Sequence, residues 1–201
     1  AARAAARAVS EAQAESLADG YDFSRYRHLV DVGGGDVALL ARVLDRYPDC
    51  RATVLGTRPV LAEALEVLDE AGVGQRCAAV EGDCSADLPR GGDGYLLRNV
   101  LRGWSDAEVL AVLRRCRAAM DPGGASLLVV TGLVPEWDDD RNPDAGLLSA
   151  LDDMELMVTG GGRERRLGEY QDLLGAAGLR LHRVVAVPGE VNLHVLEAGP
   201  G

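Results

Sequence analysis

Three consecutive glycines, Gly33 to Gly35, follow directly on the first β-rich run of the chain, residues 28–32. A turn without side chains lets a ligand approach the backbone closely, and the N-terminus of a following helix favours polar or anionic groups. Apolar residues then recur at helical spacing as far as Tyr47, and residues 51–55 form the next β-rich run. This order of strand, glycine turn, helix and strand predicts an α/β fold built on a parallel sheet.

The same alternation continues to the end of the chain. Ser105 and Glu108 form a capping box that opens a helix reaching Met120. The last two β-rich runs flank Pro188-Gly189-Glu190, which predicts an antiparallel hairpin. The expectation is therefore a seven-stranded, mostly parallel sheet with helices on both faces. Its strands are expected at residues 28–32, 51–55, 77–80, 93–97, 126–131, 181–187 and 191–197.

Charge and composition exclude several classes of protein. The net charge of the 201 residues is -11, which disfavours binding to nucleic acid or to anionic membranes. No apolar stretch is long enough to cross a bilayer, and the Ala-rich start is no secretory signal. The 4 cysteines show no paired spacing, so a cytoplasmic protein without a metal is expected. The acidic run of residues 138–140 is read as a solvated loop, with a metal site as the alternative.

Further short motifs accompany the glycine turn at regular spacing. From Tyr21 onward, nearly the whole chain resembles the catalytic domain of the plant-type and actinobacterial S-adenosylmethionine (SAM)-dependent O-methyltransferases. The motifs are YDFS (residues 21–24), LVDVGGG (29–35), EGD (81–83), LP (88–89), YLLRNVL (95–101), WSD (104–106), PGG (122–124) and GGRER (161–165).

The resemblance implies a fold, a reaction and a partner. The fold is the Rossmann-like sheet of class I methyltransferases, with residues 21–201 as the catalytic domain and residues 1–20 as the tail of an N-terminal helical domain. The reaction is methyl transfer from SAM, without a metal, to a hydroxyl of an aromatic or polyketide-like molecule in secondary metabolism, such as antibiotic biosynthesis. A partner chain or a homodimer is implied because the family's N-terminal domain closes the substrate pocket.

The resemblance also assigns cofactor-binding roles. Gly33, Gly34 and Gly35 border the methionine part of SAM, and Arg98 replaces a basic residue near the cofactor. Asp83 accepts from the adenine amine, with a turn residue as the alternative, and Cys84 lies next to the adenine. Trp104 stacks on the adenine, or else packs as a core or helix-staple residue.

Five positions depart from the family pattern. Val37 stands where another glycine is usual, and its branched side chain is expected to crowd the amino-acid end of SAM. Gly56 replaces the aspartate that binds the ribose, and Cys84 replaces a larger apolar residue. Arg102 stands at the position of the family's general-base histidine, and Thr131 at that of the acid which orients it. Because a guanidinium stays protonated in proteins, Arg102 cannot act as a base.

Three functions stay open at this point. The first is methyl transfer, with the acceptor placed next to the methyl group as an already acidic phenol. The second keeps the fold without methyl transfer, as another natural-product tailoring enzyme such as a cyclase, or as a non-catalytic partner subunit. The third is an NADP-dependent oxidoreductase, because Gly33, Gly35 and Ala38 fit the dinucleotide pattern. Glu164 is read as a substrate-side residue, a helix cap or the partner of an arginine.

Overall fold

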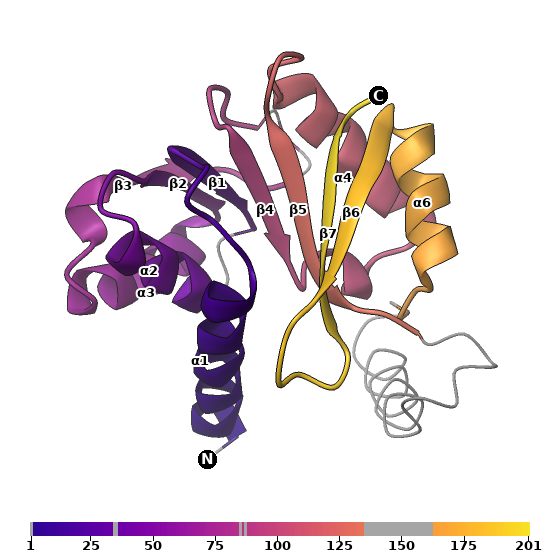
Figure 1. The fold of residues 1–201 in the computed structure, drawn as a ribbon. Coiled ribbons are helices and arrows are strands. Elements are labelled where there is room, and N and C mark those ends of the chain that lie inside the picture. The colour runs from indigo at the N-terminus through magenta and orange to yellow at the C-terminus, as the bar shows by residue number, and fades with distance from the viewer. Residues whose placement is uncertain (1, 34–35, 85, 87, 135–162) are drawn as a thin grey trace.

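A computed structural model describes residues 2–33, 36–84, 86, 88–134 and 163–201 (Figure 1). The acidic run of residues 138–140 lies outside this part of the chain. The helices are α1 (Ala2–Gly20), α2 (Ala38–Arg46), α3 (Arg58–Glu70), η1 (Gly74–Arg76), η2 (Leu101–Gly103), α4 (Asp106–Ala119) and α6 (Leu167–Ala176). The strands are β1 (His28–Val32), β2 (Arg51–Gly56), β3 (Cys77–Glu81), β4 (Gly94–Arg98), β5 (Ser126–Gly132), β6 (Leu179–Ala186) and β7 (Leu193–Pro200).

The described strands form one sheet of order β3-β2-β1-β4-β5-β7-β6. Strands β1 to β5 are parallel, and β7 runs antiparallel to both β5 and β6. This arrangement confirms the predicted α/β class, the seven strands and the C-terminal hairpin. The strand order reverses between β1 and β4, and ligands of open α/β sheets bind at the carboxyl ends of strands beside such a point.

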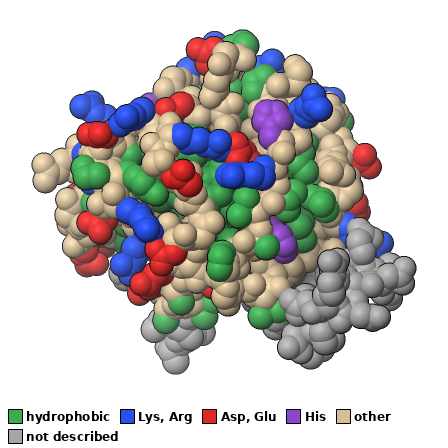
Figure 2. Space-filling model, viewed as in Figure 1, with side chains coloured by type: hydrophobic (Ala, Val, Ile, Leu, Met, Phe, Trp, Pro, Cys, Tyr) green, Lys and Arg blue, Asp and Glu red, His purple; other side chains and the backbone are tan. Residues whose placement is uncertain are grey.

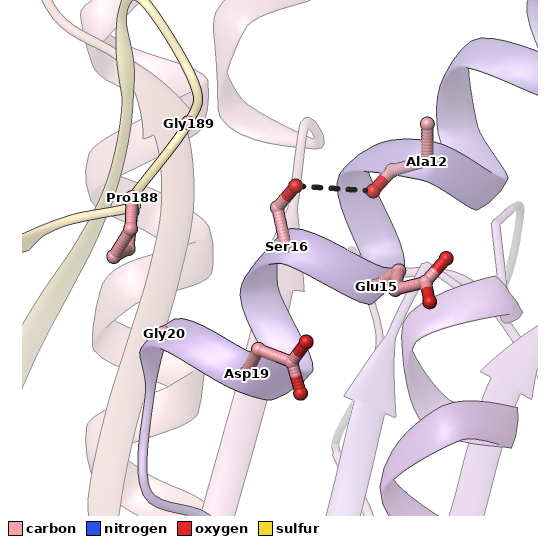
Figure 3. Close-up of a pocket in the computed structure, with 7 residues that line it drawn as sticks. All are labelled: Ala12, Glu15, Ser16, Asp19, Gly20, Pro188 and Gly189. Carbon is pink, nitrogen blue, oxygen red and sulfur yellow. Dashed lines mark hydrogen bonds between the residues drawn. The ribbon is translucent and has the colours of Figure 1, made fainter.

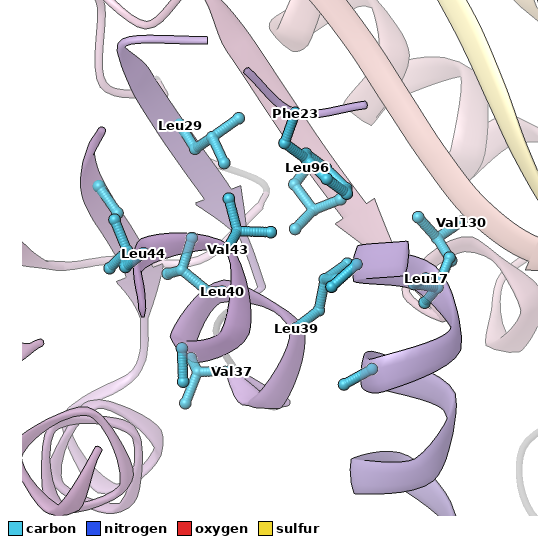
Figure 4. Packing of buried hydrophobic residues seen from close by; sticks show 14 of the residues in the cluster. Leu17, Phe23, Leu29, Val37, Leu39, Leu40, Val43, Leu44, Leu96 and Val130 are labelled. Carbon is cyan, nitrogen blue, oxygen red and sulfur yellow. The ribbon is translucent and has the colours of Figure 1, made fainter. Parts of the chain in front are cut away.

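Two hydrophobic clusters cover the two faces of the sheet. On one face, α1, α2 and α3 pack through residues such as Leu17, Leu40 and Leu68. Figure 4 shows part of this cluster, with Leu17 and Leu40 labelled. On the other face, α4 and α6 pack through Leu113 and Leu174. The predicted helices on both faces are thereby confirmed. Helix α1 lies against α2, while the proposed division of the chain between residues 20 and 21 stays a prediction.

The YDFS segment closes a buried polar cluster on the last strand. Glu197 of β7 is only 5% exposed, and the Tyr21 hydroxyl donates to its Oε2 at 2.9 Å. Arg25 pairs with the same carboxylate, and Arg183 lies 3.3 Å from it. Burial acts to raise the pKa of Glu197, but the hydrogen bonds from Arg25 and Tyr21 outweigh it, so the pKa is lowered. The cluster joins the segment after α1 to strand β7.

The lowered pKa of Glu197 predicts an acid-sensitive contribution to stability. Because the pKa of Glu197 is lowered in the folded state, its ionised carboxylate stabilises the fold at pH values above the ordinary pKa of 4.5. This stabilisation is lost progressively as the pH falls below that value. Glu197→Gln is expected to cost about 1–3 kcal/mol at pH 7, since both arginines are half-exposed and screened. Urea unfolding should show that the difference in the free energy of unfolding between the wild type and Glu197→Gln is smaller at pH 3 than at pH 7. Asp49→Asn, in the exposed pair with Arg27, is the control, and a gap that does not change with pH contradicts the prediction.

Candidate cofactor and acceptor site

The glycine turn lies directly against the segment that follows β4. Gly33 has a φ of +121°, and a Cβ at this position would lie 2.9 Å from Cγ2 of Val100. The Gly33 amide donates to the Leu55 carbonyl at 3.1 Å, which also ties the turn to β2. Both the backbone conformation and the contact therefore require glycine here. Gly34 and Gly35 lie outside the described residues.

Arg98 ends β4 with its guanidinium buried beside the glycine turn. Its side chain is 2% exposed, and Nη1 lies 2.9 Å from Oδ2 of Asp36. Nη2 donates to the Ser10 carbonyl of α1 at 3.1 Å, whereas Nε is buried with no hydrogen-bond partner among the described residues. Burial lowers the pKa of Arg98, and Asp36 opposes that shift. A buried guanidinium with an unused donor fits a ligand carboxylate.

Sequence reasoning missed the partners of Arg98. Asp36 directly follows the glycines, and its carboxylate also accepts from the Ser10 hydroxyl of α1. Nothing in the local pattern separates Asp36 from an ordinary helix-start residue. The two contacts join α1, the glycine turn and β4, so this helix forms one edge of the candidate site.

The side chain of Val37 lies in the hydrophobic core. It is 4% exposed and belongs to the cluster on the α2 face, as Figure 4 shows. The residue precedes the first turn of α2, and its side chain packs with neighbours such as Leu40. The structure gives this branched side chain a packing role, and the expectation that it crowds the amino-acid end of SAM stays a prediction.

Gly56 ends β2 and lies next to Glu81 of β3 in the sheet register. The Gly82 amide donates to the Gly56 carbonyl at 3.0 Å, so the ends of the two strands are tied. A Cβ at position 56 would lie 3.1 Å from Cγ1 of Val60 in α3. A side chain at this position would therefore require the Val60 side chain to shift by a few tenths of an ångström. Position 56 therefore lacks the carboxylate that the family uses to bind the ribose. The carboxylate at the paired position of the neighbouring strand is that of Glu81.

Asp83 and Cys84 follow β3 and differ in exposure. Asp83 is exposed, and its carbonyl accepts from the Ala86 amide at 3.1 Å, which matches the turn alternative. The adenine contact of Asp83 stays a prediction. Cys84 is 8% exposed within the cluster on the α4 face. Burial, and then the nearby Asp83 charge, raise the pKa of the Cys84 thiol. Cys84 therefore supplies apolar surface at the base of this region.

Trp104 lies on the segment between η2 and α4. It is half-buried and packs against the cluster on the α4 face. Its carbonyl accepts from Nη2 of Arg165 at 2.6 Å. Both of the predicted roles, core packing and a face over the adenine, are compatible with this half-buried position.

Arg102 and Glu164 form an ion pair. Nη2 of Arg102, on η2, lies 2.8 Å from Oε1 of Glu164. The arginine side chain is 25% exposed, and the glutamate side chain is 1% exposed. Of the three roles considered for Glu164, the structure brings out the pairing with an arginine. A Cβ on Gly132 would lie 3.5 Å from Oε2 of Glu164, which places this carboxylate at the end of β5.

The Thr131 side chain contacts helix α6. Thr131 is 1% exposed, and its hydroxyl lies 3.2 Å from the hydroxyl of Tyr170 in α6. Tyr170 itself is buried, and burial raises the pKa of its phenol. A hydroxyl pair of this kind carries no charge to orient a base. Sequence reasoning did not connect Tyr170 with this site.

A shallow groove elsewhere on the molecule contains none of the predicted site residues. It lies between the second half of α1 and the turn around Pro188 (Figure 3). Its side chains include Glu15, Asp19 and Ser16, whose hydroxyl donates to the Ala12 carbonyl at 3.3 Å. On the face that carries α1 and the hairpin, basic and acidic side chains are interspersed with apolar ones (Figure 2). Among the described residues, no helix combines the length and apolar content needed to span a membrane.

The sheet order, the glycine turn and the buried arginine beside it together define a protein with the class I SAM methyltransferase fold. Residues 3–180 match the model of the O-methyltransferase domain family, and the chain belongs to that family. Solved structures agree. The mitomycin 7-O-methyltransferase MmcR superposes with a TM-score of 0.87 at 37% identity, over 96% of this chain and 54% of that one.

Two curated relatives from Streptomyces differ in their named reactions. O-demethylpuromycin-O-methyltransferase of Streptomyces alboniger is 40% identical over 98% of this chain and 51% of that protein. Aclacinomycin 10-hydroxylase RdmB of Streptomyces purpurascens is 38% identical over 83% of this chain and 43% of that protein. The chain thus spans about half the length of the curated relatives that it matches.

A structure of a further relative contains both ligands of a methyl transfer. The O-methyltransferase NcsB1 of neocarzinostatin biosynthesis was solved with SAM and 2-hydroxy-5-methyl naphthoic acid. It superposes with a TM-score of 0.83 at 27% identity, over 99% of this chain and 57% of that one.

Proposed function

We propose that this protein transfers a methyl group from SAM to a hydroxyl of an aromatic small molecule in secondary metabolism. The observation that carries the proposal is Arg98, which is buried at the carboxyl end of β4 with Nε unpartnered among the described residues. Gly33 lies on the neighbouring strand end, at the point where the sheet order reverses. The family and the named activities of its members support the same function.

The residues around Gly33 would hold the cofactor. Arg98 would bind the carboxylate of SAM, and the turn at Gly33 would let the methionine part approach the backbone. Asp83 and Trp104 would contact the adenine, with Cys84 as apolar surface beneath it. When bound, SAM would supply an electrophilic methyl group for transfer to the acceptor oxygen.

The acceptor side lacks a general base at the family's position. Arg102 is held by Glu164, and Thr131 is held by Tyr170, so neither is arranged to accept the hydroxyl proton. The acceptor therefore has to lose that proton without Arg102, and positioning alone supplies part of the lowered barrier.

Calorimetric titration with SAM, and separately with NADPH, tests the proposal. We expect SAM to bind and NADPH not to bind. Arg98→Met should weaken SAM binding about tenfold or more, the effect of one lost charge-assisted hydrogen bond. Arg42→Met, on the exposed side of α2, is the matched control and should bind SAM as the wild type does. Absence of SAM binding contradicts the proposal, and NADPH binding would favour the oxidoreductase.

A second candidate keeps the fold and carries out another reaction. The altered residues Arg102 and Thr131 favour it, and so does the relative that is named as a hydroxylase. A screen of phenolic acceptors with SAM-saturated protein separates the two functions. Methylated product supports the first function, and SAM binding without any product supports the second. A homodimer or a partner chain stays a prediction, which light scattering of the purified protein can test.

A further inference from the structure

The two side chains of the Arg102–Glu164 pair differ in solvent exposure. Glu164 has 1% of its side chain exposed, whereas Arg102 has 25% exposed. A ligand that approaches this pair therefore meets the cation, and the carboxylate lies behind it. A carboxylate that pairs with a guanidinium from behind restricts the orientation of the guanidinium plane.

The exposed cation belongs to the segment that contacts the glycine turn. Val100, two residues before Arg102, lies against Gly33. The η2 backbone is fixed by Arg165, whose Nη1 donates to the Leu101 carbonyl at 3.0 Å. Arg102 is therefore attached to a rigid segment next to the proposed cofactor site.

Several described charged groups near η2 pair with one another. Asp106 pairs with Arg163 and Arg165, and Arg163 also pairs with Glu169. On the β5 side, the Thr131 hydroxyl contacts the hydroxyl of Tyr170. The side chain of Arg102, which is 25% exposed, lies on this same segment.

We infer that Arg102, held in place by Glu164, binds the ionised oxygen of an acidic aromatic hydroxyl, so that acidic phenols are the acceptor class. The inference rests on the proposed function, because it assigns the acceptor of that same site. A phenol that reaches the site as its anion has already released its proton to water, so a general base is unnecessary. Arg102 then acts through its fixed charge, which a guanidinium keeps throughout the pH range.

A fixed cation changes the acidity of a bound phenol. An opposite charge within about 4–6 Å lowers the pKa of an acid by roughly 1–3 units. Glu164 offsets part of that attraction, so we expect a shift of about one unit, which is a tenfold change in the ionisation constant.

Absorbance titration tests the inference without any turnover. The probe is a nitrophenol, whose neutral and ionised forms absorb at different wavelengths. It is added to the full chain saturated with S-adenosylhomocysteine, which carries no methyl group to transfer. We expect the pKa of the bound probe to lie about one unit below that of the free probe, and the shift to vanish in Arg102→Met. An unshifted pKa, or a shift that survives in Arg102→Met, overturns the inference.

Matched variants separate charge from structure. Arg102→Met leaves Glu164 as a buried carboxylate without its arginine, so the double variant Arg102→Met/Glu164→Gln removes both charges and keeps the test valid if the single variant unfolds. Arg102→Lys retains the cation and should retain most of the shift. Arg163→Met, on the same segment but paired with Asp106 and Glu169, should leave the shift unchanged.

Turnover with an acceptor series then distinguishes the inference from the proposed function. For ring-fluorinated versions of one acceptor, log(kcat/KM) should rise with pH up to the pKa of each phenol and level off there. One pH break shared by all acceptors would indicate an enzyme base and would overturn the inference. A normal probe shift without any methylated product contradicts the proposed function alone.

Discussion

Arg165→Ala is expected to lower the free energy of unfolding by about 3 kcal/mol, because each buried group left without its partner costs roughly 1–3 kcal/mol. Arg165 is 0% exposed, the largest of the fully buried side chains in the described part of the chain. Its guanidinium donates to the carbonyls of Leu101 and Trp104 at 3.0 and 2.6 Å. Its Nε donates to Oδ1 of Asp106 at 3.0 Å. One side chain therefore fixes both ends of η2 to the start of α4.

Arg163 provides the matched control for this experiment. It lies two residues away and pairs with the same Asp106, but its side chain is 47% exposed. Exposed pairs contribute only about 0–1 kcal/mol, so Arg163→Ala should change stability by no more than that. Urea unfolding of the two variants measures the difference. Equal losses from both substitutions would contradict the role given to the buried guanidinium.

Gly33→Ala is expected to have the second large effect. The φ of +121° lies where side chains are strongly disfavoured, at a cost of about 1–3 kcal/mol. The new Cβ would also lie 2.9 Å from Cγ2 of Val100, and overpacking of this kind costs roughly 1–3 kcal/mol. We expect a loss of stability of about 2–4 kcal/mol and SAM binding weakened about a hundredfold, since the turn has to shift. Urea unfolding and SAM calorimetry measure both effects.

Two further variants separate the causes of the Gly33 effect. Gly72→Ala introduces a side chain at a φ of +72° with nothing within 4 Å, so it should cost only about 1 kcal/mol and leave SAM binding unchanged. Gly33→Ala combined with Val100→Ala removes the contact but keeps the strained backbone. The double variant should lose less stability than the sum of the two single variants. Strict additivity would show that Val100 is not the obstacle.

The positions of the site residues along the chain could be predicted, but their partners could not. The resemblance to the family singled out Gly33, Asp83 and Arg98, and the structure has them at or just after the carboxyl ends of β1, β3 and β4. The Arg98 contacts with Asp36 and Ser10 depend on how α1 docks on α2, which no local pattern describes. The packing of Val37 in the core could not be predicted either, because the direction of a side chain at the start of a helix depends on the core that it meets.

The sequence alone determined the fold class and the order of strands and helices, because apolar periodicity and turn residues act locally along the chain. The family was indicated by the resemblance of short motifs such as LVDVGGG at residues 29–35. It also determined that Arg102 cannot be a base, since this follows from the chemistry of a guanidinium. Only the tertiary structure decided what surrounds that arginine. Glu164 is 62 residues away in the sequence (164 − 102) and reaches Arg102 through the packing of separate elements. Contacts of this range depend on the whole core, so they become visible only when the chain is folded.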